Sequence, residues 1–259
     1  MAMITLTSAS GSPGVTSTAL GLALLWPRPV LLVEADPTGG SALLAGYFRG
    51  AVEYEAGMVE LALTSSSLSD ALRDVARRID GTEVTYVAGT RSHAQAGVLR
   101  DLWPPLVQTL AELESTGQDV IVDAGRLGLN GSPTPLIDEA DLALVVSRTT
   151  LPALSGLRAW ADALQRPTLD WHQSGVLLIG EGQPYAAREI SAVVDLPVVA
   201  SIGDDPESAA VFSRGSAPPR RFETGALNRS LRAAIAAIHV VISRRRSELL
   251  SPIEGAVLA

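Results

Sequence analysis

The chain has 259 residues, a formal net charge of −8, 47% hydrophobic residues and no cysteine. The lack of cysteine excludes disulfides, thiol catalysis and cysteine-ligated metal or iron–sulfur clusters. The acidic balance argues against a protein devoted wholly to nucleic acid. All 20 basic residues are arginine, so the chain contains no lysine.

Apolar segments, taken in chain order, predict alternating strands and helices. Short continuous runs, typical of strands buried on both faces, occur at 4–8, 30–35, 84–88, 120–123, 142–147, 176–179 and 198–202. Helical stretches lie between them at 16–25, 68–79, 96–113, 154–164, 186–193 and 207–214. We therefore expect an α/β fold with a doubly wound, mainly parallel sheet of about seven strands and helices on both faces.

A single domain is expected over residues 1–250, followed by a flexible tail at 251–259. Its last helix, predicted at 226–250, has apolar residues at helical spacing and ends near Arg244, Arg245 and Arg246. We favour a helix packed on the sheet, with its terminal cations next to the negative end of the helix dipole. The alternative is a basic amphipathic surface for a membrane or DNA.

No apolar run reaches the roughly 18–20 residues of a membrane span. The first residues lead directly into a strand-like run without the basic region of a signal peptide. These two features predict a cytoplasmic protein.

A candidate phosphate-binding loop follows the first strand and opens the first helix, the usual place for such a loop in a doubly wound sheet. The standard pattern is G-x-x-x-x-G-K-[ST]. Here Ala9 stands at the first glycine, Gly14 at the second, Val15 at the lysine and Thr16 at the magnesium-binding hydroxyl.

The same stretch resembles the deviant phosphate loop of the MinD/ParA family of ATPases, K-G-G-x-G-K-[ST]-[ST]. Ser10 stands at the signature lysine of that pattern and Val15 at the second lysine, so both lysines are missing. The resemblance assigns nucleotide binding to Ser10, Gly11, Ser12, Gly14, Val15, Thr16 and Ser17.

Three further segments extend the resemblance in the right order along the chain. The segment 31–40 resembles the D-x-D-P-x-G motif, which implies that Asp36 helps to place the attacking water in catalysis. The segment 119–125 resembles Walker B, which implies that Asp123 holds Mg²⁺ through water, together with Thr16. The segment 198–206 resembles the late strand and loop beside the base, and Gly180 stands where the family has an asparagine that reads adenine.

The missing lysines affect one of the two ways in which such a loop binds phosphate. Backbone N–H groups and the helix N-terminus remain, but the full positive charge that a lysine places beside the β- and γ-phosphates is lost. Removing one partner of a desolvated charge pair costs roughly 2–5 kcal/mol. Arg126 and Arg148 are candidates to replace that charge, and the alternative is that each forms a surface salt bridge.

The resemblance implies a positioning or scaffold protein with impaired or absent ATP hydrolysis, which acts as a homodimer that recruits partners. Mg²⁺ with ATP or ADP would bind weakly or not at all. The localisation factors of Tad-type pilus assembly (the TadZ/CpaE group) are similar in tolerating atypical loops, which suggests partners in a localisation or secretion system and recruitment to the membrane periphery. The alternative is an active ATPase that partitions DNA or cargo with an arginine in place of the lysine. Direct binding to non-specific DNA or to a membrane surface is less favoured.

Overall fold

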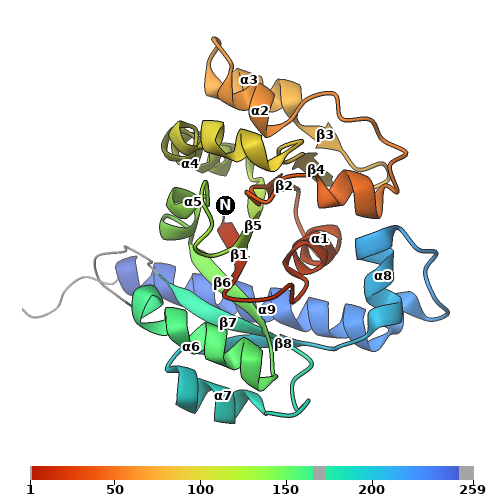
Figure 1. The fold of residues 1–259 in the computed structure, drawn as a ribbon, viewed down its shortest axis with the longest axis vertical. Coiled ribbons are helices and arrows are strands. Elements are labelled where there is room, and N and C mark those ends of the chain that lie inside the picture. Colours follow the sequence, from red (N-terminus) through yellow and green to blue (C-terminus); the bar gives the residue numbers. More distant parts are fainter. Residues whose placement is uncertain (1, 166–172, 251–259) are drawn as a thin grey trace, which may run out of the picture.

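The computed structural model describes residues 2–165 and 173–250, so the predicted tail at 251–259 lies outside the described residues. Within them, eight strands form one sheet in the order β3-β4-β2-β5-β1-β6-β7-β8 (Figure 1). The strands are β1 (Met3–Ser8), β2 (Val30–Glu34), β3 (Arg77–Arg78), β4 (Val84–Val87), β5 (Asp119–Arg126), β6 (Leu142–Arg148), β7 (Ser174–Ile179) and β8 (Val198–Ile202). All neighbouring strands are parallel except β3, which is antiparallel to β4.

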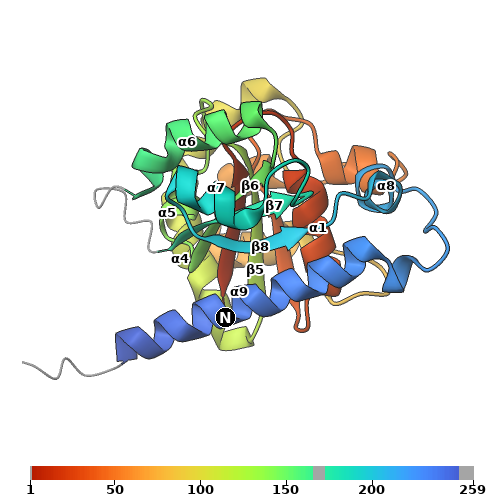
Figure 2. The same ribbon diagram turned by 90° about the horizontal axis from the view of Figure 1, so that it is seen from below.

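Helices connect the strands and cover both faces of the sheet (Figures 1 and 2). They are α1 (Val15–Leu25), α2 (Met58–Ala62), α3 (Leu68–Val75), α4 (Trp103–Glu112), α5 (Thr134–Asp138), α6 (Leu151–Gln165), α7 (Ala187–Val194), α8 (Pro206–Arg214) and α9 (Ala226–Leu250). Shorter helical turns are η1 (Leu43–Tyr47), η2 (His93–Asp101), η3 (Leu113–Thr116) and η4 (Phe222–Thr224). This architecture confirms the predicted doubly wound α/β fold.

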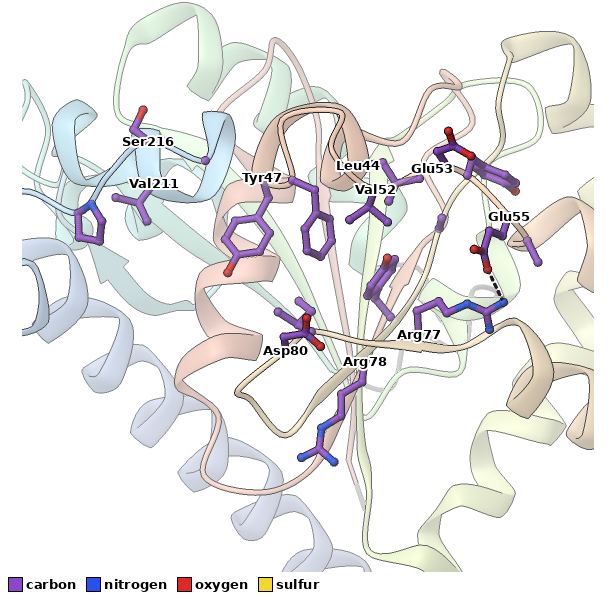
Figure 3. Close-up of a pocket in the computed structure, with 18 residues that line it drawn as sticks. Leu44, Tyr47, Val52, Glu53, Glu55, Arg77, Arg78, Asp80, Val211 and Ser216 are labelled. Atoms are coloured by element: carbon purple, nitrogen blue, oxygen red, sulfur yellow. Dashed lines mark hydrogen bonds and ion pairs between the residues drawn. The ribbon is translucent and has the colours of Figure 1, made fainter.

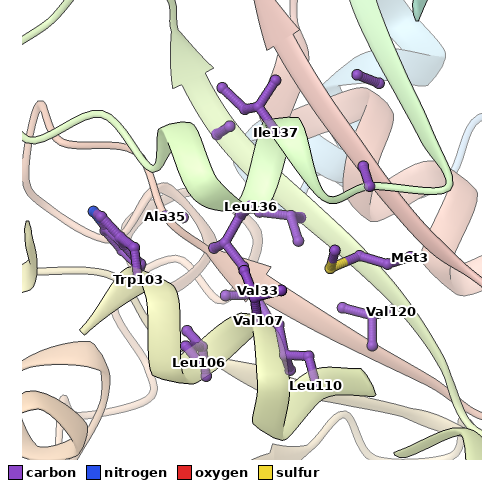
Figure 4. Packing of buried hydrophobic residues seen from close by; sticks show 14 of the residues in the cluster. Met3, Val33, Ala35, Trp103, Leu106, Val107, Leu110, Val120, Leu136 and Ile137 are labelled. Atoms are coloured by element: carbon purple, nitrogen blue, oxygen red, sulfur yellow. The ribbon is translucent and has the colours of Figure 1, made fainter. Parts of the chain in front are cut away.

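Two apolar cores lie on opposite faces of the sheet because alternate residues of each strand point to opposite sides. In β2, Val33 belongs to the core under α2 to α7, and Leu32 belongs to the core under α1, α8 and α9. Figure 4 shows the first core, where Trp103 and Leu106 of α4 pack near Leu136 of α5. Burial on both faces explains why the strands read as continuous apolar runs.

The last helix, α9, packs along α1 and β8. Its side chains Leu231, Ile235 and Ile238 are buried in the core on that side, as the favoured interpretation of its apolar spacing predicted. Among the arginines near its end, Arg244 pairs with Glu248 within the same helix. Within the described part of the chain, no helix combines the length and the apolar character needed to cross a bilayer.

Two of the predicted helices have different boundaries in the structure. The helix expected at 68–79 ends at Val75, and the next residues form the short edge strand β3. The helix expected at 96–113 is divided into the 3₁₀ turn η2 and α4. Pro104 and Pro105 lie in the first turn of α4, where proline is tolerated, whereas inside a continuous helix their missing N–H groups would break the hydrogen-bond ladder.

The order of the strands creates a crevice at the carboxyl end of β1. The chain leaves β1, forms α1 and returns to β2, which is separated from β1 by β5, while β6 lies on the other side of β1. Such switch points are where open α/β sheets usually bind ligands. The loops that follow β1, β2, β5, β6, β7 and β8 meet at this edge.

Candidate functional site

The loop between β1 and α1 has the conformation of an open anion cradle. Gly11 and Gly14 have φ angles of 64° and 105°, which place both in the left-handed region that favours glycine. No atom outside the immediate chain neighbours lies within 4 Å of the position that a Cβ would take at either residue. The backbone of both glycines therefore faces open space.

The first turn of α1 adds unsatisfied donors to this cradle. Gly14 occupies the N-cap position, so no side chain caps the helix, and no acidic residue lies in its first turn. The first N–H groups of a helix lack intrahelical partners and carry partial positive charge. The loop and α1 together therefore direct donors toward the crevice.

The two positions that would carry lysines hold short neutral side chains. Val15 is 7% exposed and packs into the core beneath α1. Ser10 lies against Gly156 of α6, where a Cβ would stand 2.5 Å from the Ser10 hydroxyl oxygen and 2.6 Å from its Cβ. Neither position supplies a cation to the crevice, and Ser10 contacts its own chain's α6.

The carboxylate predicted for magnesium, Asp123, is buried at the carboxyl end of β5. Its side chain accepts hydrogen bonds from the Thr16 hydroxyl and from the N–H of Gly125, the latter at 3.1 Å. Burial raises the pKa of Asp123 to about 7, and the nearby carboxylates of Glu34 and Asp36 add to the shift, while the two hydrogen bonds oppose it. Thr16 and Asp123 are thus adjacent, as the resemblance implied.

Asp36 lies on the loop after β2, facing the Gly125 backbone. Its carboxylate accepts the N–H of Thr38 at 2.8 Å. A Cβ at Gly125 would stand 2.5 and 2.6 Å from the two carboxylate oxygens of Asp36, and Gly125 has a φ of 62°. Glycine at this position therefore allows the loops after β2 and β5 to approach closely.

A second buried acid, Glu34, lies at the end of β2 and was not identified from the sequence. Its carboxylate accepts hydrogen bonds from the Ser41 hydroxyl, the Leu43 N–H at 2.8 Å and the Gly89 N–H at 3.2 Å. Burial raises its pKa, which those bonds partly offset. These contacts link β2 to η1 and to the loop after β4, so the role of Glu34 is to hold loops together.

Two cavities open at this crevice. The first, of about 400 Å³, is lined by Ser8, Gly11, Ser12, Gly14, Val15, Thr16, Ser17, Asp36, Thr38, Gly125, Arg126 and Leu129. The second, of about 420 Å³, lies between the start of α1 and the loops after β7 and β8, near α8. Most residues that the resemblance assigned to nucleotide binding line the first cavity, but Ser10 does not, because it faces α6.

The two candidate replacement arginines have different environments. Arg148 donates to Asp204 at 2.8 Å and forms an ion pair with it at the second cavity. Arg126 lines the first cavity and forms no ion pair with any described residue. Gly180 lies beside Asp204, whose Cβ would be 3.1 Å from a Cβ at Gly180. Of the two arginines, Arg126 alone is placed to face a bound phosphate group without breaking an ion pair.

The described residues contain no group of three or more His, Asp or Glu side chains arranged to hold a metal ion. Mg²⁺ usually retains several waters and binds through one or two carboxylates together with substrate phosphates. A magnesium ion at this crevice would therefore depend on Thr16, Asp123, water and phosphate oxygens together. The donor set fits a magnesium–nucleotide complex better than a free ion.

Solved structures with the same fold are MinD and ParA ATPases. The septum site-determining protein MinD complexed with Mg-ADP from Pyrococcus horikoshii has a TM-score of 0.69 and 17% identity, covering 96% of this chain and 98% of its own. The MinC:MinD cell division protein complex of Aquifex aeolicus has a TM-score of 0.67 and 15% identity, covering 98% of this chain and 99% of its own. A ParA family ATPase from Chlorobium tepidum has a TM-score of 0.69 and 12% identity, covering 92% of this chain and 98% of its own.

Neither a protein-family model nor a curated protein sequence matches this chain. At identities of 12–17% the structural matches show the fold and leave the activity of this chain open. The chain has the fold of the MinD/ParA-type P-loop ATPases over nearly its whole length.

Proposed function

We propose that this protein, which has the fold of MinD/ParA-type ATPases, is a positioning or scaffold protein with impaired or absent ATP hydrolysis. It acts by forming a homodimer and recruiting protein partners of a localisation system, with assembly of a pilus or secretion apparatus as the specific setting. It works in the cytoplasm and is brought to the membrane periphery by its partners. One observation carries the proposal: the phosphate crevice keeps its backbone donors and acids while both lysine positions are neutral.

The charges in the crevice explain why hydrolysis is impaired. A nucleotide polyphosphate entering the first cavity meets the carboxylate of Asp36, with Asp123 buried beside Thr16 and with Arg126 as the one lining cation among the described residues. Backbone N–H groups still favour an anion, but the missing lysine charge costs roughly 2–5 kcal/mol of binding. Transition-state stabilisation in phosphoryl transfer is almost entirely positioning and charge, so hydrolysis falls further than binding does.

The structural neighbours support the remaining parts of the proposal. MinD binds Mg-ADP in one neighbour and assembles with MinC in another. We extend these properties to this chain as weak binding of Mg²⁺ with ATP or ADP and as recruitment of protein partners. The nucleotide contacts come from Gly11, Ser12, Gly14, Val15, Thr16 and Ser17 of the loop, which line the first cavity. Thr16 and Asp123 lie on the magnesium side, and Asp36 lies next to the attacking water.

A lysine restored at position 15 tests the charge argument. We expect Val15→Lys to bind magnesium–ATP at least about tenfold more tightly than the natural chain, measured by isothermal titration calorimetry. Val15→Gln is the matched control, because glutamine is also long and polar but carries no charge. Equal affinities for the two variants would contradict the charge argument.

The oligomeric state tests the scaffold part. Sedimentation velocity should show a defined dimer with and without ATP, and phosphate release should stay at the blank level. Dimers that form only with ATP, or magnesium-dependent turnover at an ordinary enzymatic rate of about 1 per second or more, would refute the proposal.

The second candidate is an active ATPase that partitions DNA or cargo, and the position of Arg126 favours it. Arg126 lines the phosphate cavity without an ion-pair partner among the described residues, so it is free to contact a phosphate. If this candidate is right, turnover is measurable, and both Arg126→Gln and Asp36→Ala abolish it. Arg148→Gln serves as the comparison, because Arg148 is already paired with Asp204.

A further inference from the structure

A larger cavity, of about 690 Å³, lies away from the crevice, next to the β3 edge of the sheet (Figure 3). Its walls come from η1, from the segment 52–56, from the β3–β4 region and from α8 with the loop after it. We call it the edge pocket. None of the residues assigned to nucleotide binding lines it, so it is a separate feature of the molecule.

Aromatic rings form one wall of the edge pocket. Tyr47 and Phe48 of the η1 region stand edge to face with ring centroids 5.0 Å apart, and Phe48 is 5.5 Å from Tyr86 of β4. Three of the four tyrosines in the chain line this cavity, but the Arg91 guanidinium already lies over the Tyr54 ring, 4.3 Å from its centroid, which leaves Tyr47 and Tyr86 for a ligand. Aromatic faces attract cations through the ring quadrupole, so the wall suits a positively charged group.

Tyr86 supplies an independent indication of a ligand. Its side chain is 4% exposed and lines the edge pocket, yet its hydroxyl makes no hydrogen bond with any other residue that the structure describes. The hydroxyl oxygen itself is not fully buried, so it opens to the pocket although the rest of the side chain is packed in the core. The hydroxyl is therefore available to a group that enters the pocket.

The charges around the edge pocket leave two carboxylates without a partner. Arg77 pairs with Glu55 at 3.2 Å, the contact drawn in Figure 3. Arg78, the other lining arginine, pairs with a glutamate outside the pocket at 2.5 Å. The remaining lining acids, Glu53 and Asp80, form no ion pair or hydrogen bond with the described residues. The unpaired charge at the pocket is therefore negative.

Apolar side chains complete the pocket between the acids. Val52 is 37% exposed and lies next to Leu44, whereas Val211 lies on the other side of the pocket (Figure 3). A group that fills the pocket thus needs a cationic end and an apolar stem. Arginine and lysine side chains have this form, since their aliphatic stems pack on apolar surface while the charged end stays with its partners.

We propose that the edge pocket binds a segment of a protein partner that carries two arginine or lysine side chains, with one cation at Glu53 and the other at Asp80, because these acids lie at opposite ends of the pocket (Figure 3). This inference rests on the partner recruitment proposed above and needs no nucleotide. It therefore stands or falls separately from the tests of ATP binding and of dimerisation.

The binding test uses the full chain without nucleotide and the probe peptide Ala-Leu-Arg-Val-Arg-Ala in isothermal titration calorimetry. The matched control peptide carries citrulline at both arginine positions, which keeps the shape and removes the charge. We expect saturable binding of the arginine peptide and binding of the citrulline peptide that is at least about tenfold weaker. Equal binding, or no binding of the arginine peptide up to about 1 mM, overturns the proposal.

Two variants locate the binding. The double variant Glu53→Gln, Asp80→Asn should lower the affinity for the arginine peptide about tenfold, since each exposed charge pair contributes up to roughly a factor of five. The control is Glu139→Gln, Asp162→Asn, which makes the same change of charge just after α5 and on α6. An equal loss in both double variants would mean a general charge effect and would overturn the proposed site.

Tyr86→Phe removes the hydroxyl and keeps the ring. This variant should bind the arginine peptide several-fold more weakly, with no change in the melting temperature of the protein. An unchanged affinity would show that Tyr86 is not part of the site. A final arm adds free spermidine as competitor. Displacement of the peptide at equal concentration would identify a small amine as the occupant and overturn the assignment to a protein segment.

Discussion

Replacement of Asp123 by asparagine should remove part of the pH dependence of the free energy of unfolding. Asp123 is 2% exposed, and burial raises its pKa from an ordinary value of 3.8 to about 7. The folded chain therefore keeps a proton that the unfolded chain releases, so stability is greatest below pH 4 and falls as the pH rises toward 7. Above pH 7 both states are ionised and the loss is constant.

The size of the effect follows from the shift. A difference of about 3 pKa units corresponds to about 4 kcal/mol in total. About 2 kcal/mol of this is lost between pH 5.5 and pH 8, where the folded group ionises. Asp123→Asn lacks the titration, so its stability should fall by about 2 kcal/mol less over the same range.

Urea denaturation of both proteins at pH 5.5 and pH 8, followed by circular dichroism, measures this difference. Glu34 also has a raised pKa, and its carboxylate repels that of Asp123, so the comparison reports Asp123 together with its effect on Glu34. Parallel pH dependence in the two proteins would refute the assignment. In the proposed function Asp123 holds Mg²⁺ through water, which requires its ionised form, so Mg²⁺-dependent nucleotide binding should strengthen as the pH rises through about 7.

Arg28→Ala should lower the free energy of unfolding by about 1–2 kcal/mol. The arginine is half exposed, but it contacts the buried Asp119 carboxylate at 2.6 Å, and its removal leaves that carboxylate with fewer donors. Urea denaturation should show this, whereas Arg73→Ala, which breaks an exposed pair, should cost less than about 1 kcal/mol. Equal losses would contradict the role of burial. Gly125→Ala should displace Asp36 and destabilise the chain by more than about 1 kcal/mol, from the close contact and the positive φ. An unchanged melting temperature would show that the two loops can separate without cost.

The sequence predicted the fold well because its signals are local. Continuous apolar runs identified the seven parallel strands, and Gly11 and Gly14 marked the loop that opens α1. The strand β3 was missed, since two arginines carry no strand pattern and the preceding helical periodicity ran into them. Glu34 was missed for a similar reason, because its hydrogen-bond partners come from segments far along the chain.

In the candidate site, too, the sequence predicts the residue identities, whereas the contacts between distant segments come from the tertiary structure. The sequence by itself determined the missing lysines, the glycines of the cradle and the acids Asp36 and Asp123, since these are residue identities at fixed spacing. Only the tertiary structure decided which arginine faces the cavity: Arg126 does, while Arg148 pairs with an aspartate 56 residues away.

The packing of distant segments also decided the position of Ser10 and the existence of the edge pocket. Ser10 is directed against Gly156 of α6, and the pocket joins residues from 44 to 88 with residues from 211 to 218. Periodicity encodes which residues form an element and which face it buries. The contacts between elements depend on how the folded layers pack together, which no local pattern contains.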